Sequence, residues 1–133
     1  MDITITFPGG KRVDAHYHDF HIKTDQSVKV GGEGSAPTPF MLFLASIGTC
    51  AGVYIADFCR SRDIPPDGIK ITEHVERNSE TRRLEKVSID IHVPEDFPKK
   101  YHNALIRAAN LCAVKKAISD PPEFDVIVST TEE

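Results

Sequence analysis

The feature that most constrains this chain is an uncharged stretch of eighteen residues, Pro39 to Ala56, which reads PFMLFLASIGTCAGVYIA. A segment of this length and composition is either a membrane-spanning helix or a helix buried inside a protein. Small residues from Ala45 to Gly52 weaken the hydrophobicity of its centre, and no second stretch of this kind occurs. We therefore expect a buried helix and no membrane span.

The flanking residues define where this helix begins and ends. Thr38 can cap the free N–H groups of the first turn, and Pro39 at the first helical position loses no hydrogen bond. The helix is predicted to run to about Arg62, where the sequence DIPPDG (63–68) forms a stop and a turn.

A helix that is apolar on every side needs cover on every side, which one small sheet cannot provide. We therefore expect an intimate homodimer that shares this helix. Gly48 and Gly52, four residues apart, would allow another backbone to approach closely.

The rest of the chain alternates between strand and helix patterns. Period-two alternation and turn residues predict strands, and apolar spacing of three and four predicts helices. Strands are predicted over 2–7, 12–24 (one strand or two), 26–30, 69–77, 84–93 and 123–129, and short helices over 99–109 and 114–118.

This order predicts an α+β fold with a mostly antiparallel sheet and a long buried central helix. The chain of 133 residues fits one domain, 1–133, without a linker or a repeat. Its net charge of −4 gives no basic excess for phosphates, so nucleic acid is not an expected partner. The first seven residues lack the pattern of a signal peptide, which favours a cytoplasmic protein.

Three cysteines, Cys50, Cys59 and Cys112, are an odd number without a close-spaced pair. This spacing argues against a disulfide framework or a zinc ribbon. Cys59 follows Cys50 by nine residues, which places the two on opposite sides of one helix. Cys112 begins the final short helix, where free N–H groups favour a thiolate. If Cys50 and Cys112 lie close together, they form a dithiol pair; otherwise each is a small core residue.

Other motifs are weaker. His16, His18 and His21 cluster, and the first two would share a strand face as metal ligands could, but no further ligand with suitable spacing completes a site. We expect exposed or hydrogen-bonded histidines and no metal. The sequence has no G-x-S-x-G, P-loop or G-x-G-x-x-G motif.

Two segments resemble signatures of one family. The stretch SAPTPFMLFLASIGTC (35–50) resembles a Gly-rich loop and a Pro-led apolar helix that carry a cysteine, and ANLCAV (109–114) resembles the family's second cysteine signature. The family is the OsmC/Ohr-like one, the osmotically inducible and organic hydroperoxide resistance proteins. The resemblance covers nearly the whole chain in the order of its elements.

This resemblance implies an intertwined homodimer that reduces organic hydroperoxides in oxidative stress defence. Cys50 would attack the peroxide, Cys112 would resolve the sulfenic acid as a disulfide, and an external dithiol would restore both thiols. No cofactor is needed. Cys59 has no role in this cycle.

Family peroxidases hold a glutamate near the start of the cysteine helix and an arginine near the thiolate. Phe40 and Met41 stand in the glutamate's region here, and Lys29 and Arg12 lie near the positions that two branches of the family use for the arginine. Further candidate substrate-binding residues are Glu33 in the loop and the apolar wall of Phe40, Met41, Phe43 and Leu44, which would suit a fatty or aromatic peroxide.

Two alternatives stay open at this point. The chain could be a binding protein or redox sensor that holds a small apolar or electrophilic ligand in a pocket at the dimer interface. It could also be a structural dimer with inert thiols.

Overall fold

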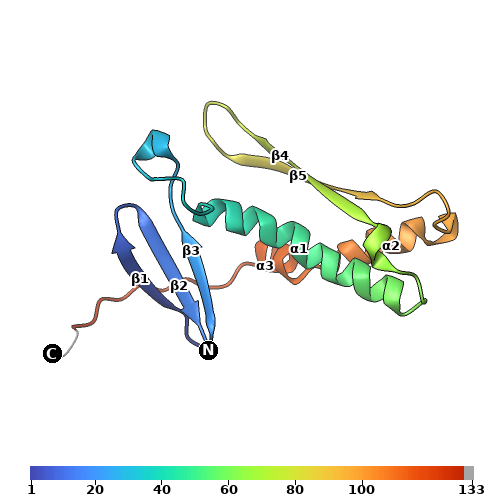
Figure 1. Ribbon diagram of the computed structural model, residues 1–133, viewed down its shortest axis with the longest axis horizontal. Helices are drawn as coiled ribbons and strands as arrows, with labels where there is room; N and C mark the ends of the chain where they lie inside the picture. Colours follow the sequence, from blue (N-terminus) through green and yellow to red (C-terminus); the bar gives the residue numbers. More distant parts are fainter. Residues whose placement is uncertain (131–133) are drawn as a thin grey trace. The chain divides into compact units, whose positions relative to one another are not determined.

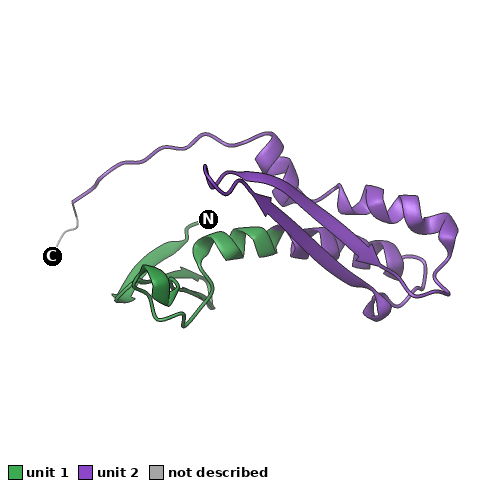
Figure 2. Cartoon of the chain, turned by 90° about the horizontal axis from the view of Figure 1, so that it is seen from above, with its two compact units in different colours: residues 1–46 green, residues 47–133 purple. Residues whose placement is uncertain are grey.

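The computed structural model describes residues 1–130 and confirms an α+β architecture with antiparallel sheets and three α-helices (Figure 1). The chain forms two compact units, Met1–Ser46 and Ile47–Glu133 (Figure 2). A single domain over 1–133 stays a prediction.

The first unit is built on a three-stranded antiparallel sheet. Its strands are β1 (Thr4–Gly9), β2 (Arg12–Tyr17) and β3 (Phe20–Thr24), in the order β1-β2-β3. Gly9 and Gly10 take φ values of 141° and 59° in the first turn, a region that glycine enters without steric cost. The region 12–24 therefore forms two strands.

The register divides this sheet into a polar and an apolar face. Ile5 pairs with Ala15, which pairs with Ile22, so the three side chains lie in one row. The neighbouring row of Thr4, His16 and His21 points to the opposite face. Large side chains of the apolar face are exposed: Ile5, Phe7, Phe20 and Ile22.

The strand predicted over 26–30 is wrong. Those residues begin a loop that contains a single 3₁₀ turn, Val28–Val30. The buried carboxylate of Asp25 accepts the backbone N–H of Gln26, and the N–H of Gly32 bonds to the carbonyl of Ser27. The loop's backbone groups are thus satisfied locally, where a strand would need a partner.

The second unit contains most of helix α1 (Pro39–Arg60), the antiparallel hairpin of β4 (Lys70–Arg77) and β5 (Leu84–His92), and helices α2 (His102–Ala109) and α3 (Ala113–Ser119). A 3₁₀ turn, Lys99–Tyr101, precedes α2, so the helix predicted over 99–109 is mainly α-helical. The core of the second unit is formed by Ile55, Cys59, Phe97 and Leu105.

Within one chain, α1 buries a single stripe of side chains. The buried positions follow the helical spacing of three and four: Leu44, Ile47, Ala51, Ile55 and Cys59. On the other side, Val53 is 58% exposed. By length and composition alone α1 could cross a membrane, a test that the core helix of a globular protein also passes. Within one chain only the stripe given above is buried.

Gly48 and Gly52 face β4 of the same chain. A Cβ on Gly48 would lie 2.7 Å from Oε1 of Glu73, and a Cβ on Gly52 would lie 3.6 Å from Cδ1 of Ile71. Within one chain, side chains of β4 therefore lie beside both glycines, and the approach of a second backbone at this place stays a prediction.

The strand predicted over 123–129 does not form. Residues 121–130 follow α3 as an extended segment without strand pairing, and Phe124, Val126, Ile127 and Val128 are all exposed (Figure 2). A strand needs a neighbour for its backbone groups, and the described part of the chain provides none for this segment.

The core position of Leu105 gives a stability prediction. Leu105 is 2% exposed on α2, whereas the adjacent Ile106 is 55% exposed. We expect Leu105→Ala to lower the free energy of unfolding by about 2–5 kcal/mol, because it leaves a cavity, and Ile106→Ala to lower it by less than about 1 kcal/mol. Urea unfolding of both variants measures the difference; equal losses would contradict the assigned core.

Candidate functional site

Helices α1 and α3 bring Cys50 and Cys112 together within the second unit. Cys50 lies partly exposed in the middle of α1, and Cys112 is the buried residue immediately before α3. The sulfur of Cys50 accepts hydrogen bonds from the Cys112 thiol and from the backbone N–H groups of Ala113 and Val114. The two thiols are free in this structure and lie within hydrogen-bonding reach.

These donors favour the thiolate of Cys50. The N–H of Val114 contributes most and the Cys112 thiol next, and together they lower the pKa of Cys50 below the ordinary thiol value despite some burial. The sequence assigned the free N–H groups of the final helix to Cys112, but in the structure they act on Cys50. These contacts therefore favour the ionised form of Cys50, and the thiolate is the nucleophilic form of a cysteine.

Cys112 has two acceptors for its single proton. Its sulfur lies 3.8 Å from the carbonyl oxygen of Ile47, one turn before Cys50 on α1, and its thiol also reaches the sulfur of Cys50. An S–H group donates to one acceptor at a time. A negative charge on Cys50 would attract the proton, so the bond between the two cysteines strengthens when Cys50 ionises.

Cys59 has the opposite environment on the same helix. It is completely buried among Ile55, Phe97 and Leu105, and this burial raises the pKa of its thiol. Burial in apolar surroundings makes a cysteine inert. Its place in the core agrees with the small hydrophobic residue that the sequence predicted.

The loop that precedes α1 is held by one buried carboxylate in the first unit. Asp25 is 1% exposed and accepts hydrogen bonds from the Ser35 hydroxyl (2.6 Å), from the Ser35 N–H and from the N–H groups of Gln26 and Glu33. The Ser35 hydroxyl contributes most to lowering the pKa of Asp25 from 3.8 to about 2. Sequence analysis missed Asp25, although an Asp before a Gly-rich loop is a known anchor of turns.

Asp25 makes this loop an ordered structure. A Cβ on Gly32 would lie 2.0 Å from the carbonyl oxygen of Gln26, so only glycine fits there. The candidate residues Lys29 and Glu33 both lie in this loop, with Lys29 in the 3₁₀ turn and Glu33 bonded to Asp25 through its backbone. Both side chains are exposed.

The remaining candidates lie elsewhere in the first unit. Arg12 begins β2, and its Nε donates to the carbonyl of Gly9 at 3.3 Å. Phe40 and Phe43 pack against each other in the first turns of α1, with ring centroids 5.5 Å apart, and both keep a large exposed area.

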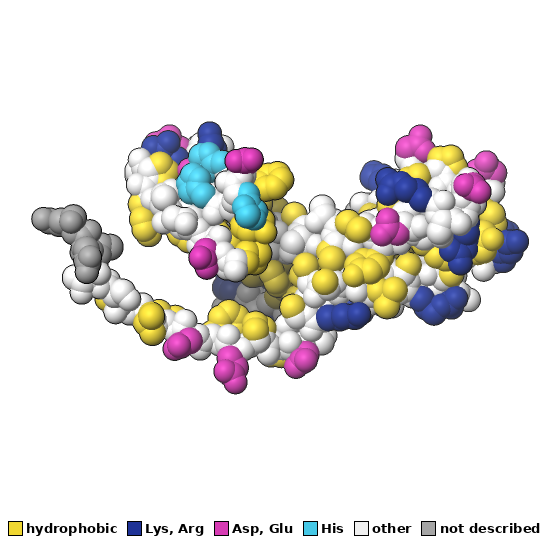
Figure 3. Space-filling view, turned by 90° about the horizontal axis from the view of Figure 1, so that it is seen from below, with side chains coloured by type: hydrophobic (Ala, Val, Ile, Leu, Met, Phe, Trp, Pro, Cys, Tyr) yellow, Lys and Arg dark blue, Asp and Glu magenta, His cyan; other side chains and the backbone are white. Residues whose placement is uncertain are grey.

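Two of the three clustered histidines, His16 and His21, form a stacked pair. His16 does not share a strand face with His18, because β2 ends at Tyr17 and His18 lies in the following turn with φ of 51°. His16 instead stacks on His21, and His21 bonds to Asp14 at 2.7 Å. Histidine side chains gather on one surface in Figure 3. Within residues 1–130 no group of three His, Cys, Asp or Glu side chains is placed to hold a metal.

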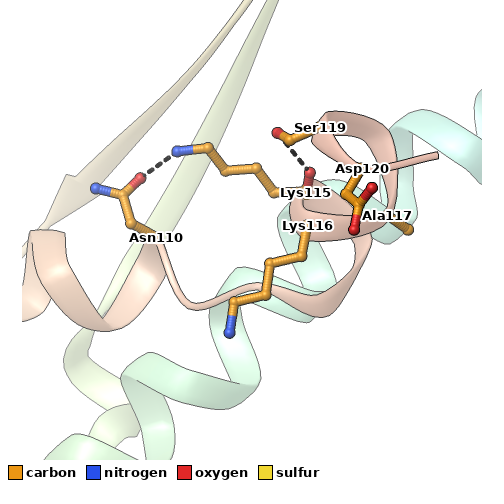
Figure 4. Close-up of a pocket in the computed structure, with 6 residues that line it drawn as sticks. All are labelled: Asn110, Lys115, Lys116, Ala117, Ser119 and Asp120. Atoms are coloured by element: carbon orange, nitrogen blue, oxygen red, sulfur yellow. Dashed lines mark hydrogen bonds between the residues drawn. The ribbon is translucent and has the colours of Figure 1, made fainter.

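A shallow hollow of about 550 Å³ lies beside α3 (Figure 4). Lys115 donates to the side-chain oxygen of Asn110 at 2.6 Å, and the Ser119 hydroxyl donates to the backbone of Lys115. The ammonium group of Lys116 and the carboxylate of Asp120 complete its polar lining. Sequence analysis did not single out Lys115 and Lys116, which both lie on α3.

The family model described as "OsmC-like protein" matches residues 32–127 of the chain. This range includes the Gly-rich loop, helix α1 and both cysteines of the thiol pair. It covers well over half of the chain.

Individual relatives agree with this match. The uncharacterized protein MJ0573 of Methanocaldococcus jannaschii is 26% identical over 96% of this chain and 73% of its own length. A crystal structure from Psychrobacter arcticus 273-4, of a protein named for osmotic stress induction and detoxification response, aligns with a TM-score of 0.74 at 25% identity, over 86% of this chain and 85% of that one.

A more distant structure shares the fold. The organic hydroperoxide resistance protein OsmC of Legionella pneumophila aligns with a TM-score of 0.57 at 20% identity, over 89% of each chain.

The contacts of Cys50 predict how its reactivity depends on pH. We expect Cys50 to be alkylated by iodoacetamide with a midpoint below that of an ordinary thiol, because its thiolate has three donors. Cys112→Ala removes one donor and should raise the midpoint by about one pH unit, whereas Cys112→Ser keeps a donor and should raise it less. Mass spectrometry of the Cys50 peptide measures the rates. An identical midpoint in wild type and in Cys112→Ala would contradict the hydrogen bond.

The lowered pKa of Asp25 predicts a pH-dependent contribution to stability. The folded pKa lies below the unfolded one, so this contribution is present above a pH of about 4 and is lost as the pH falls toward about 2. We expect Asp25→Asn to have a lower free energy of unfolding than wild type at neutral pH. The difference in the free energy of unfolding should become smaller at acidic pH. Urea midpoints across this range measure it, with Lys29→Gln as an exposed control from the same loop. A gap that does not change with pH would contradict the assignment.

Proposed function

Because this chain belongs to the family of OsmC-like proteins, we propose that it is a thiol-dependent peroxidase that reduces organic hydroperoxides. The observation that carries the proposal is the contact between Cys50 and Cys112, in which the Cys50 thiolate accepts hydrogen bonds from the second thiol and from the start of α3. The name of the Legionella pneumophila structure supports the choice of substrate class.

In the first step, the Cys50 thiolate attacks the outer oxygen of the hydroperoxide ROOH. The S–O bond forms as the O–O bond breaks, and the leaving alkoxide takes a proton from water and departs as the alcohol ROH. Cys50 is oxidised to the sulfenic acid Cys–SOH, and the peroxide is reduced. The lowered pKa of Cys50 raises the fraction of the protein that can react at neutral pH.

In the second step, the Cys112 sulfur attacks the sulfenic sulfur of Cys50. The S–S bond forms, the S–O bond breaks, and the hydroxide combines with the thiol proton and leaves as water. The thiol already donates to Cys50, so the resolving sulfur is close to its target before the reaction begins. An external dithiol then reduces the disulfide and becomes a disulfide itself.

The proposal also includes the assembly and the residues that bind the substrate. The protein acts as a homodimer in the cytoplasm and needs no cofactor. The exposed rings of Phe40 and Phe43 bind the apolar part of the hydroperoxide, and Lys29 or Arg12 supplies the positive charge that family peroxidases take from an arginine. Lysine would provide a point charge only, whereas arginine would provide a planar fork. Glu33 is a further substrate-binding candidate at the loop.

The thiol cycle gives a direct prediction. One equivalent of tert-butyl hydroperoxide should convert the reduced protein to a Cys50–Cys112 disulfide, which peptide mass spectrometry detects. Turnover with excess dithiothreitol should fall at least about a hundredfold in Cys50→Ser, because no other thiolate reaches the peroxide.

Two further variants separate the roles of the cysteines. Cys112→Ser should keep the first step and accumulate a sulfenic acid that dimedone traps, and Cys59→Ser should keep both steps as the matched control. If peroxide leaves both thiols free in the wild type, the peroxidase proposal is wrong. Saturable binding of an apolar ligand without turnover would then favour a binding protein.

A further inference from the structure

We infer that Asn110 and Lys115 are positioning residues, whose side-chain hydrogen bond fixes the turn that carries Cys112 toward Cys50. The bond joins Nζ of Lys115 to Oδ1 of Asn110 at 2.6 Å and spans this turn from α2 to α3 (Figure 4). Its effect on thiol reactivity stands on the contacts of Cys50 alone, whereas its effect on the resolving step rests on the proposed function.

The turn between α2 and α3 determines where the resolving thiol points. Helix α2 ends at Ala109 and α3 begins at Ala113. Asn110 keeps helical backbone angles, with φ of −73° and ψ of −9°, whereas Cys112 takes φ of −47° and ψ of 123°. The chain therefore changes direction at Cys112, and the direction in which α3 leaves sets the place of the Cys112 sulfur.

The backbone and the side chain of Leu111 fix this turn only in part. The N–H of Leu111 donates to the carbonyl of Ala108 at 3.0 Å, but the N–H of Cys112 donates to Ala109 at 3.4 Å, which is long for a backbone hydrogen bond. The side chain of Leu111 is 49% exposed and provides no buried anchor. The turn therefore needs support from another side chain.

Helix α3 has few contacts that could hold its direction without this support. None of its seven residues is buried, and Cys112 in the N-cap position makes no side-chain capping bond. The first N–H groups, those of Ala113 and Val114, bond to the sulfur of Cys50. A helix this short is not stable by itself, so its orientation depends on the contacts of its first turn, where Lys115 lies.

The bond between Lys115 and Asn110 supplies a contact of this kind. An ammonium group that donates to an amide oxygen makes a charge-assisted bond, which is shorter and stronger than a neutral one. Both side chains are exposed, so we expect a modest contribution to overall stability. The effect on reactivity can be larger, because a displacement of about 1 Å changes the rate of a step between two positioned groups.

The chain offers matched variants for a test. Lys116 is exposed beside Lys115 on α3 and carries the same charge, but its ammonium group has no partner within residues 1–130. Lys116→Met therefore removes a charge without removing the bond, and Asn110→Ala removes the bond without changing any charge. Asn110→Asp keeps an acceptor oxygen for Lys115 and serves as the conservative rescue.

The first measurement is the pH dependence of Cys50 alkylation by iodoacetamide. Asn110→Ala and Lys115→Met should each raise the midpoint by about half a pH unit, because the N–H donors of α3 are less often in place. Lys116→Met and Asn110→Asp should leave the midpoint unchanged. An unchanged midpoint in Asn110→Ala, or an equal rise in Lys116→Met and Lys115→Met, would overturn the inference.

The second measurement separates the two thiol steps after one equivalent of tert-butyl hydroperoxide. Above the alkylation midpoint of every variant, the free Cys50 thiol should disappear at the wild-type rate, since all variants are then ionised. Disulfide formation should be slower by about threefold in Asn110→Ala, with more sulfenic acid trapped by dimedone, because the Cys112 sulfur is less well placed. A loss of stability alone would not delay the second step and spare the first.

A double variant shows whether the two side chains act through one bond. Asn110→Ala combined with Lys115→Met should be no slower in disulfide formation than either single variant, because the bond is already lost. Delays that multiply would show two separate effects and would overturn the inference.

The two measurements distinguish this inference from the proposed peroxidase. If the alkylation midpoints shift as expected but peroxide leaves both thiols free, the peroxidase proposal is wrong and the positioning role stands. If peroxide forms the disulfide at the same rate in Asn110→Ala and in the wild type, the positioning role is wrong and the peroxidase proposal stands.

Discussion

The structure depends on one constraint, the need to cover an apolar helix of 22 residues in a short chain. Different parts of the chain cover different sides of α1. The core residues around Ile55 pack against one stripe of the helix. Strand β4 packs against the side where Gly48 and Gly52 carry no side chain, and the start of α3 contacts the side of Cys50. Each contact that buries the helix also fixes a segment that the fold needs.

The contact between α1 and the start of α3 both covers the helix and places hydrogen-bond donors beside a cysteine. A polar group placed against an apolar helix must find a partner, and the free N–H groups of Ala113 and Val114 find the sulfur of Cys50. The same contact that satisfies these donors stabilises a thiolate.

The sequence predicted α1 and the strands of both sheets because their apolar periodicity is local and continuous. It failed at 26–30, where the hydrogen bonds of the Asp25 carboxylate outweigh strand propensity. It also failed at 123–129, which has the pattern of a strand but no neighbouring strand within residues 1–130. It identified Cys50 and Cys112 through a family resemblance. Which thiol receives the N–H groups of α3 depends on how two helices pack, and no local pattern encodes that.

Cys50 and Cys59 show why packing decides the chemistry. Both lie on α1, and nine residues separate them, so they face opposite ways. Burial without donors raises the pKa of Cys59, whereas three donors outweigh partial burial and lower the pKa of Cys50. The same residue type on the same helix thus has a raised pKa at one position and a lowered pKa at the other. The difference lies in which segment covers each side of α1, so the packing that stabilises the helix also sets the direction in which the pKa of each cysteine is shifted.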